Sequence, residues 1–256
     1  MENVKRITKK LIKIVKRASK IYLNKNFFEL KERHKFENDD VTNLDIKTQD
    51  YLKNECYKLF KNINFIGEEG KEESNSPLSV VVDPIDGTFN FKHKINNFGS
   101  QICLLERGEP IISILYLPKS NELYYANKFG AFKNGIKIKV SENTDLKQSI
   151  ALLGDFVKET NFSVQKQCFN IINNHFKRIR MLGSSCVDNC FMSEGKADVY
   201  IIFSSNKWDL IPGQFLIKMA GGQVLCNLEK NIYISGNKYI VDEVVALLKA
   251  KGVKFE

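Results

Sequence analysis

The first 25 residues carry apolar side chains at three- and four-residue steps. Val4, Ile7, Leu11 and Ile14 begin the series, and it continues to Tyr22. This is the periodicity of an amphipathic helix. Lysines occupy another face of the same segment. We therefore expect a helix over residues 2–25 that packs on a core and keeps a basic side in water. A helix that binds a nucleic acid or a membrane surface would show the same pattern.

The rest of the first half reads as a helix followed by strands. Acidic, Asn and Thr residues at 38–45 precede an apolar-periodic stretch, which indicates a helix start. A short strand at 65–67, a polar loop at 71–77 and a β-branched strand at 78–82 follow. Apolar runs at 100–105, 110–117, 122–125 and 130–132 alternate with turn residues. Successive hairpins of this kind predict an antiparallel sheet.

The second half alternates strands and helices. We expect strands at 150–153, 178–182, 197–203 and 223–226, and helices at 163–173, from 185 to about 195, from 208 to about 220, and at 241–250. Pro212 would fall in the first turn of its helix, where a missing N–H is tolerated. The change of pattern divides the chain into an α+β half, residues 1–145, and an α/β half, residues 146–256.

Composition places the chain among ordinary proteins of the cytoplasm. Hydrophobic residues make up 43% and charged residues 27% of its 256 residues. No apolar run reaches the roughly 18 residues of a membrane span, and no signal-peptide pattern is present. Six scattered cysteines predict buried free thiols rather than disulfides or a zinc site. The net charge of +9 suits a polyanion or an anionic substrate, although a diffuse lysine excess is typical of a solvated surface.

The chemistry centres on residues 80–91, where an apolar strand runs into two acids. Asp83 and Asp86 flank a proline that stiffens the backbone. Two close carboxylates repel each other unless cations lie between them, and Mg²⁺ prefers such oxygen ligands. Gly87 allows close approach of a ligand, and a helix beginning at Thr88 would turn its N–H groups toward an anion. Taken alone, Asp-x-x-Asp-Gly also occurs in tight turns.

Longer motifs resolve that ambiguity. The string from Asp83 to Phe91, together with four other segments, resembles the inositol monophosphatase family of lithium-sensitive, Mg²⁺-dependent phosphatases. The other segments are Val41-Thr42-Asn43-Leu44-Asp45, Phe65-Ile66-Gly67-Glu68-Glu69, the region from Gly130 to Gly135, and Trp208-Asp209 with Gly213 and Ala220-Gly221-Gly222. They occur in the family's order over most of the chain. The resemblance implies a layered αβαβα sandwich of the inositol-monophosphatase and fructose-bisphosphatase type, α+β in one half and α/β in the other.

The resemblance also assigns roles to individual residues. It implies two or three Mg²⁺ ions, with metal ligands at Glu68, Asp83, the carbonyl of Ile85, Asp86 and Asp209. Asp45, Thr88 and Glu68 would be catalytic, and Thr88 hydrogen-bonded to Asp45 would orient the attacking water. Substrate contacts would come from Asp86, Gly87, Thr88, Gly183, Ser184, Ser185 and Asp209. Phosphoryl transfer by an activated water needs no protein nucleophile.

Two departures from the family pattern concern the substrate. Phe89 stands where many inositol-type members have threonine, and Ile202 stands where they have a glutamate that binds substrate hydroxyls. Isoleucine accepts no hydrogen bond, so hydroxyl recognition is weakened; Ser204, Asn206 or Lys207 are the candidate substitutes. We expect hydrolysis of a small phosphomonoester, with inositol-1-phosphate or a similar polyol or sugar phosphate as the default. Histidinol phosphate and fructose-1,6-bisphosphate are the alternatives.

The resemblance further implies a homodimer inhibited by Li⁺, and the lack of a long apolar run predicts no membrane association. A different class of function stays open, because some bacterial relatives bind transcription machinery or RNA and this chain is basic. In that case the protein would be a binding factor that retains the phosphatase residues. Lysines gathered on one face away from the site would favour it, whereas scattered lysines would favour substrate steering.

Overall fold

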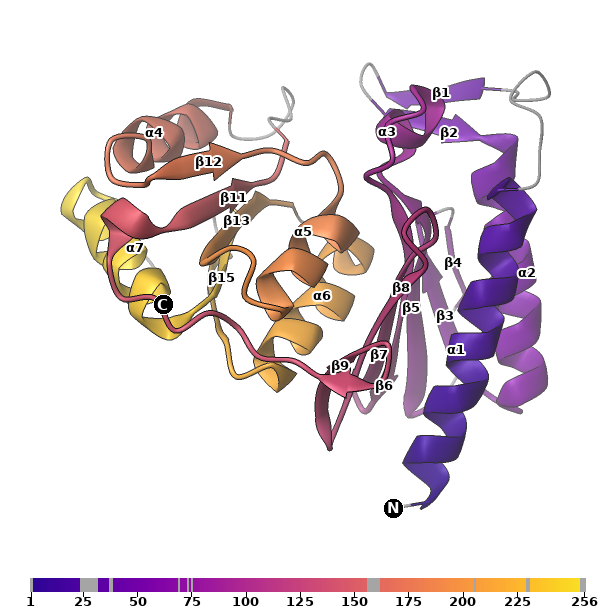
Figure 1. The fold of residues 1–256 in the computed structure, drawn as a ribbon. Helices are drawn as coiled ribbons and strands as arrows, with labels where there is room; N and C mark the ends of the chain where they lie inside the picture. The colour runs from indigo at the N-terminus through magenta and orange to yellow at the C-terminus, as the bar shows by residue number, and fades with distance from the viewer. Residues whose placement is uncertain are drawn as a thin grey trace.

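The first helix packs as its periodicity predicts. The computed structural model describes residues 2–23, 32–36, 39–68, 70–72, 74, 76–155, 162–204, 206–228 and 231–253. Helix α1 (Glu2–Leu23) buries Leu11, Val15 and Ala18, while Lys9 and Lys13 stay exposed. The expected residues 24 and 25 lie outside the described residues. Helix α2 (Asn43–Leu59) lies beside α1, and the two form the outer layer on one side of the molecule (Figure 1).

An eight-stranded sheet lies against α1 and α2. Its order is β10-β9-β8-β7-β6-β5-β3-β4, and every neighbouring pair is antiparallel except β3 and β5. The strands are β3 (Asn64–Gly67), β4 (Gly70–Glu72), β5 (Leu78–Asp86), β6 (Gly99–Glu106), β7 (Glu109–Leu117), β8 (Glu122–Asn127), β9 (Gly130–Lys133) and β10 (Ile136–Lys137). The predicted hairpins are confirmed. The loop prediction for 71–77 is wrong at its start, because residues 70–72 pair with β3.

A smaller, mixed sheet of five strands lies on the other side of the molecule. Its order is β12-β11-β13-β15-β14, with β11 parallel to both its neighbours and β15 antiparallel to both of its own. The strands are β11 (Ile150–Leu153), β12 (Arg178–Arg180), β13 (Val199–Phe203), β14 (Gln223–Asn227) and β15 (Ile232–Gly236). The alternating pattern predicted four of these, and β15 was missed.

Two helices lie between the sheets and two cover the outside of the smaller one. Figure 1 shows α5 (Ser185–Ser193) and α6 (Lys207–Met219) in the middle layer, and α4 (Phe162–Ile172) and α7 (Lys238–Ala250) on the far side. The order of layers is therefore αβαβα, and the expected layered sandwich is confirmed. Three apolar clusters fill the spaces between the layers, around Val80, Leu216 and Val244.

Shorter elements complete the chain and correct the predictions in places. They are the hairpin β1 (Glu32–Phe36) and β2 (Asp39–Thr42), the short helix α3 (Thr88–Lys92) and the 3₁₀ turn η2 (Leu146–Gln148). Because α6 begins at Lys207, Pro212 lies beyond its first turn rather than in it. The larger sheet ends at Lys137 and the smaller begins at Ile150, while the division at residue 145 stays a prediction.

Two expectations from composition can be compared with the structure. All six cysteines are free thiols, and five of them are buried, as predicted. Within the described part of the chain, no helix combines the length and the apolar character needed to cross a membrane.

Candidate active site

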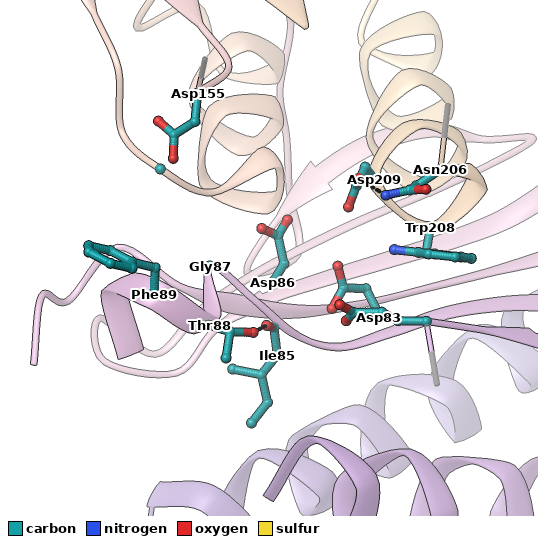
Figure 2. A pocket seen from close by; sticks show the side chains of 12 residues that line it. Asp83, Ile85, Asp86, Gly87, Thr88, Phe89, Asp155, Asn206, Trp208 and Asp209 are labelled. Carbon is teal, nitrogen blue, oxygen red and sulfur yellow. Dashed lines mark hydrogen bonds between the residues drawn. The ribbon is translucent and has the colours of Figure 1, made fainter. Parts of the chain in front are cut away.

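A cavity of about 250 Å³ opens between the two halves, at the end of β5. Its walls bring together segments that are distant in sequence. They are Glu68, Asp83, Ile85, Asp86, Gly87, Thr88, Phe89, Asp155, Gly183, Asn206, Trp208 and Asp209. Figure 2 views the cavity with Asp83 and Asp209 on one side of Asp86 and with Phe89 and Asp155 on the other. The predicted acids from three separate segments therefore meet at one place.

A bulge in β5 puts Asp83 and Asp86 on the same wall. Side chains three apart in a regular strand point to opposite faces of the sheet. Here Asp83 pairs with Gln101 and Asp86 with Gly99, so three steps along β5 match two steps along β6. The extra residue, next to a proline without an N–H, restores both carboxylates to one side. The acids lie within an irregular strand, rather than on a turn that follows the strand.

Asp83 is held in an environment that opposes its charge. Only 2% of its surface is exposed, and Oδ1 has no hydrogen-bond partner among the described residues. Burial raises the pKa of Asp83 well above its ordinary value, and the neighbouring carboxylates of Glu68, Asp86 and Asp209 raise it further. Buried carboxylates normally have partners. The local chemistry of this wall is therefore that of a cation site.

Asp86 is tied to the beginning of helix α5. The backbone N–H of Ser185 donates to Oδ1 at 3.0 Å, and its hydroxyl donates to Oδ2 at 2.6 Å. The N–H of Cys186 and the Gln101 side chain (3.0 Å) also donate to Oδ2. Burial raises the pKa of Asp86, while these hydrogen bonds act to lower it. The positive end of α5 thus stabilises a carboxylate of the protein itself.

This arrangement separates the three small residues that were expected to contact substrate. Gly183 lines the cavity, whereas Ser184 and Ser185 do not. Ser184 caps α5 through its side chain, which accepts from the N–H of Val187 at 3.3 Å. Ser185 supplies two of the hydrogen bonds to Asp86. In the structure both serines act on the protein, and their contact with substrate stays a prediction.

Thr88 and Asp45 meet as the resemblance predicts. The Thr88 hydroxyl lies 2.9 Å from the carbonyl oxygen of Ile85 and 3.3 Å from Oδ1 of Asp45. Asp45 comes from the first turn of α2 and is only 1% exposed. A hydroxyl has one proton, so Thr88 donates to either the carbonyl or the carboxylate at any moment. The unused lone pair of Thr88 can then accept from a water in the cavity.

The backbone conformation at position 87 and the close neighbours of that position both require glycine. Its φ is 85°, in the left-handed region, and an added Cβ would lie 2.9 Å from the carbonyl oxygen of Asn97. The next turn is tied to the other half by Asn90, whose amide donates to the carbonyls of Leu182 (2.7 Å) and Asn97 (2.8 Å). Gly87 therefore lets α3 lie directly against the loop before α5.

Asp209 reaches the cavity from the first turn of α6. Its Oδ2 accepts from the Ser204 hydroxyl at 3.0 Å and from the Asn206 amide at 3.1 Å. Among the residues that the structure describes, no group of three or more His, Cys, Asp or Glu side chains is arranged to hold a metal ion. The carboxylates of Asp86 and Asp209 instead accept hydrogen bonds from protein donors.

Two residues of the site were missed by sequence reasoning. Asp155 stands two residues after the end of β11 and lines the cavity. An acid placed just after a parallel strand is a usable signal, because ligands bind at that edge of a sheet. Gln101, fully buried in the apolar strand β6, orients Asp86. Ile202, half-buried on β13, does not line the cavity.

The chain is similar to known proteins over most of its length. The model of a family described as the inositol monophosphatase family matches residues 2–251. A curated relative from Thermotoga maritima, named fructose-1,6-bisphosphatase/inositol-1-monophosphatase, is 33% identical over 217 residues, 82% of each chain. A relative from Xylella fastidiosa, named Nus factor SuhB, is 29% identical over 73% of this chain and 68% of its own.

A solved structure agrees with this assignment. The inositol monophosphatase of Thermotoga maritima superposes with a TM-score of 0.85 at 28% identity, covering 98% of both chains. The family model spans nearly the whole chain. The fold of the chain also matches that of the solved structure. The chain therefore belongs to the inositol monophosphatase family.

Proposed function

We propose that this protein hydrolyses a small phosphomonoester with the help of Mg²⁺ and a water activated in the cavity. Family membership supports a phosphatase, and the cation, the mechanism and the substrate are our proposal. The observation that carries it is the wall around Asp83. A buried carboxylate with an unpartnered oxygen stands among three further acids, Glu68, Asp86 and Asp209.

The donor set fits a hard divalent cation. Mg²⁺ prefers carboxylate, carbonyl and water oxygens, and the wall offers four carboxylates and the carbonyl of Ile85. Two or three ions would balance the charge that raises the pKa of Asp83. Asp86 and Asp209 would have to turn from their present donors to take part. When bound, Mg²⁺ would supply positive charge for the phosphate and would lower the pKa of a water toward neutral pH.

The protein's own groups would position that water. The Thr88 hydroxyl donates to Asp45 and accepts from the water, so a proton lost by the water can pass through Thr88 to the Asp45 carboxylate. Asp45 is buried, only 1% exposed, next to the Thr88 hydroxyl. Gly87 allows the phosphate to approach the backbone closely. No protein nucleophile is needed, because phosphoryl transfer depends on positioning and charge stabilisation.

The substrate is a small phosphorylated alcohol. The relatives' printed names support inositol-1-phosphate and fructose-1,6-bisphosphate, and histidinol phosphate stays an alternative. A homodimer, inhibition by Li⁺ and a cytoplasmic location are parts of the same proposal. The cavity of about 250 Å³ suits a small molecule rather than a polymer.

Phosphate release from a panel of monoesters tests the proposal. The purified protein is assayed with Mg²⁺, with EDTA and with added Li⁺. We expect hydrolysis that EDTA abolishes and Li⁺ inhibits, and that Asp83→Asn and Asp209→Asn remove almost completely. Asp50→Asn, an exposed acid on α2, is the matched control and should keep full activity. Absence of phosphate release from every monoester would overturn the proposal.

A second candidate is a binding factor that retains the phosphatase residues. It is supported by the relative named Nus factor SuhB and by exposed lysines on α1, which forms the outer layer: Lys5, Lys9, Lys10, Lys13 and Lys20. Glutamate at Lys9 and Lys13 should then abolish binding of RNA while phosphate release is unchanged. Absence of RNA binding by the wild type would leave the enzyme as the function of the chain, and equal binding by both proteins would rule out α1 as the RNA-binding surface.

A further inference from the structure

Asp155 is a carboxylate of the cavity that the metal-binding wall does not use. It lies on the opposite side of Asp86 from Asp83 and Asp209 (Figure 2). Its backbone is fixed by the strand before it, because Gly154 donates to the carbonyl of Ile201 at 2.9 Å. Asp155 forms no hydrogen bond or ion pair with another described residue. An ionised carboxylate accepts hydrogen bonds only, so Asp155 offers an acceptor to whatever enters this side.

The neighbouring residue explains why Asp155 is the acceptor here. Gly154 lies directly on Ile202, since an added Cβ would be 3.1 Å from Cγ1 of that side chain. Strands β11 and β13 are parallel neighbours, and Ile202 packs against Gly154, the residue before Asp155. The acceptor on this wall therefore comes from β11, while β13 contributes apolar support. Among the described residues on this side of Asp86, Asp155 is the charged acceptor.

Phe89 provides an aromatic face at the mouth of the same cavity. Its side chain is 61% exposed. The ring is stacked on His93, with centroids 4.1 Å apart and planes inclined by 27°. Nδ1 of His93 lies 2.9 Å from the carbonyl of Phe89, which fixes the imidazole beneath the ring. One face of Phe89 is thus supported, and the other is open to a ligand.

We infer that Asp155 and Phe89 bind the alcohol part of the substrate and select phosphomonoesters whose alcohol carries a flat unsaturated ring and an amino group. The ring would stack on the open face of Phe89, and the ammonium would form a charge-assisted hydrogen bond with Asp155. A polyol would form neither the ring stacking nor the charge-assisted hydrogen bond. The inference rests on the proposed phosphatase function and names its substrate class.

Four synthetic esters with the same CH₂–O–phosphate group separate the two contacts. Benzyl and cyclohexylmethyl phosphate differ in ring flatness and in the acidity of the leaving alcohol, and the second difference is the same for the wild type and Phe89→Leu. Para-aminomethylbenzyl and para-methylbenzyl phosphate differ in the ammonium. kcat and KM are measured with Mg²⁺ for the wild type, Asp155→Asn and Phe89→Leu. Asp50→Asn and Phe162→Leu, at exposed sites away from the cavity, serve as matched controls.

The wild type should prefer the aminomethyl over the methyl compound by about tenfold to hundredfold in kcat/KM, mainly through KM. Asp155→Asn should remove that preference by lowering kcat/KM for the aminomethyl compound toward its value for the methyl compound. Phe89→Leu should remove a preference of about three- to tenfold for benzyl over cyclohexylmethyl. Equal treatment of all four esters by the wild type, or a uniform loss in either variant, would overturn the inference while the phosphatase function stands. Failure to hydrolyse these esters and inositol-1-phosphate alike would instead overturn the proposed function.

Discussion

Replacing Asp83 with asparagine should stabilise the metal-free protein while it abolishes activity. Asp83 is buried, its Oδ1 has no partner, and Glu68, Asp86 and Asp209 oppose its charge. An unsatisfied buried acceptor costs about 1–3 kcal/mol. Asparagine removes the charge, and its amide group can donate to a neighbouring carboxylate. We expect the free energy of unfolding to rise by about that amount, which is roughly 2–12 °C in melting temperature for a chain of this size.

Mg²⁺ should reverse the order of stability. A ligand that binds only the folded protein adds about 2.7 kcal/mol at a concentration of 100 times its Kd. The wild type would gain this in Mg²⁺, whereas Asp83→Asn would gain little because it lacks a central ligand. Thermal melts of both proteins in EDTA and in a Mg²⁺ series measure the effect, with Asp50→Asn as the control. The reasoning fails if the variant is less stable than the wild type in EDTA, or if it gains as much from Mg²⁺.

Three further changes test other parts of the site and fold. Thr88→Val should lower kcat by about 100-fold or more, whereas Thr88→Ser keeps the hydroxyl and should retain most activity; equal losses in steady-state assays would deny Thr88 its role. Gly213→Ala should destabilise by about 1–3 kcal/mol, because its Cβ would lie 2.0 Å from Cγ of Asn189. In denaturant titrations Asn189→Ala should recover part of that loss, and additive effects would contradict the contact. Burial raises the pKa of Glu194, but hydrogen bonds from Lys133, Lys196 and Tyr124 lower it overall. Glu194→Gln should therefore lose about 1–3 kcal/mol at neutral pH, with the difference vanishing as the pH falls below about 4; a pH-independent difference would refute this.

The local sequence predicted the elements with strong periodicity. Helix α1 and the hairpins β6 to β9 follow directly from apolar spacing and turn residues, since their side chains report their own burial. The strand β15 was missed because it begins after a turn, with Asn231 at φ 50°, inside a stretch without clear alternation. Strand β4 was missed because its polar residues pair at a sheet edge, where apolar character is not required.

The candidate site was predictable only in part. Asp83, Asp86 and Thr88 could be named because the motif that contains them is long and specific. Asp155 and Gln101 could not be ranked, since a single acid after a strand or a single amide within one is common in any chain. Their roles depend on which side chains face them, namely the cavity for Asp155 and the Asp86 carboxylate for Gln101. Substrate contact by Ser184 and Ser185 was predicted from their position before a helix, and in the structure they cap α5 and hold Asp86.

By itself, the sequence determined the family, the layered architecture and the set of acids, because each of these depends on residue types and their order along the chain. Only the tertiary structure decided how those acids are presented. The bulge at Pro84 turns Asp83 and Asp86 to one side, although their spacing would separate them in a regular strand. The parallel pairing of β11 with β13 brings Gly154 onto Ile202 and Asp155 to the cavity, where the sequence had instead indicated Ser204, Asn206 or Lys207. Side-chain direction and long-range pairing are properties of the packed sheets, and local sequence does not contain them.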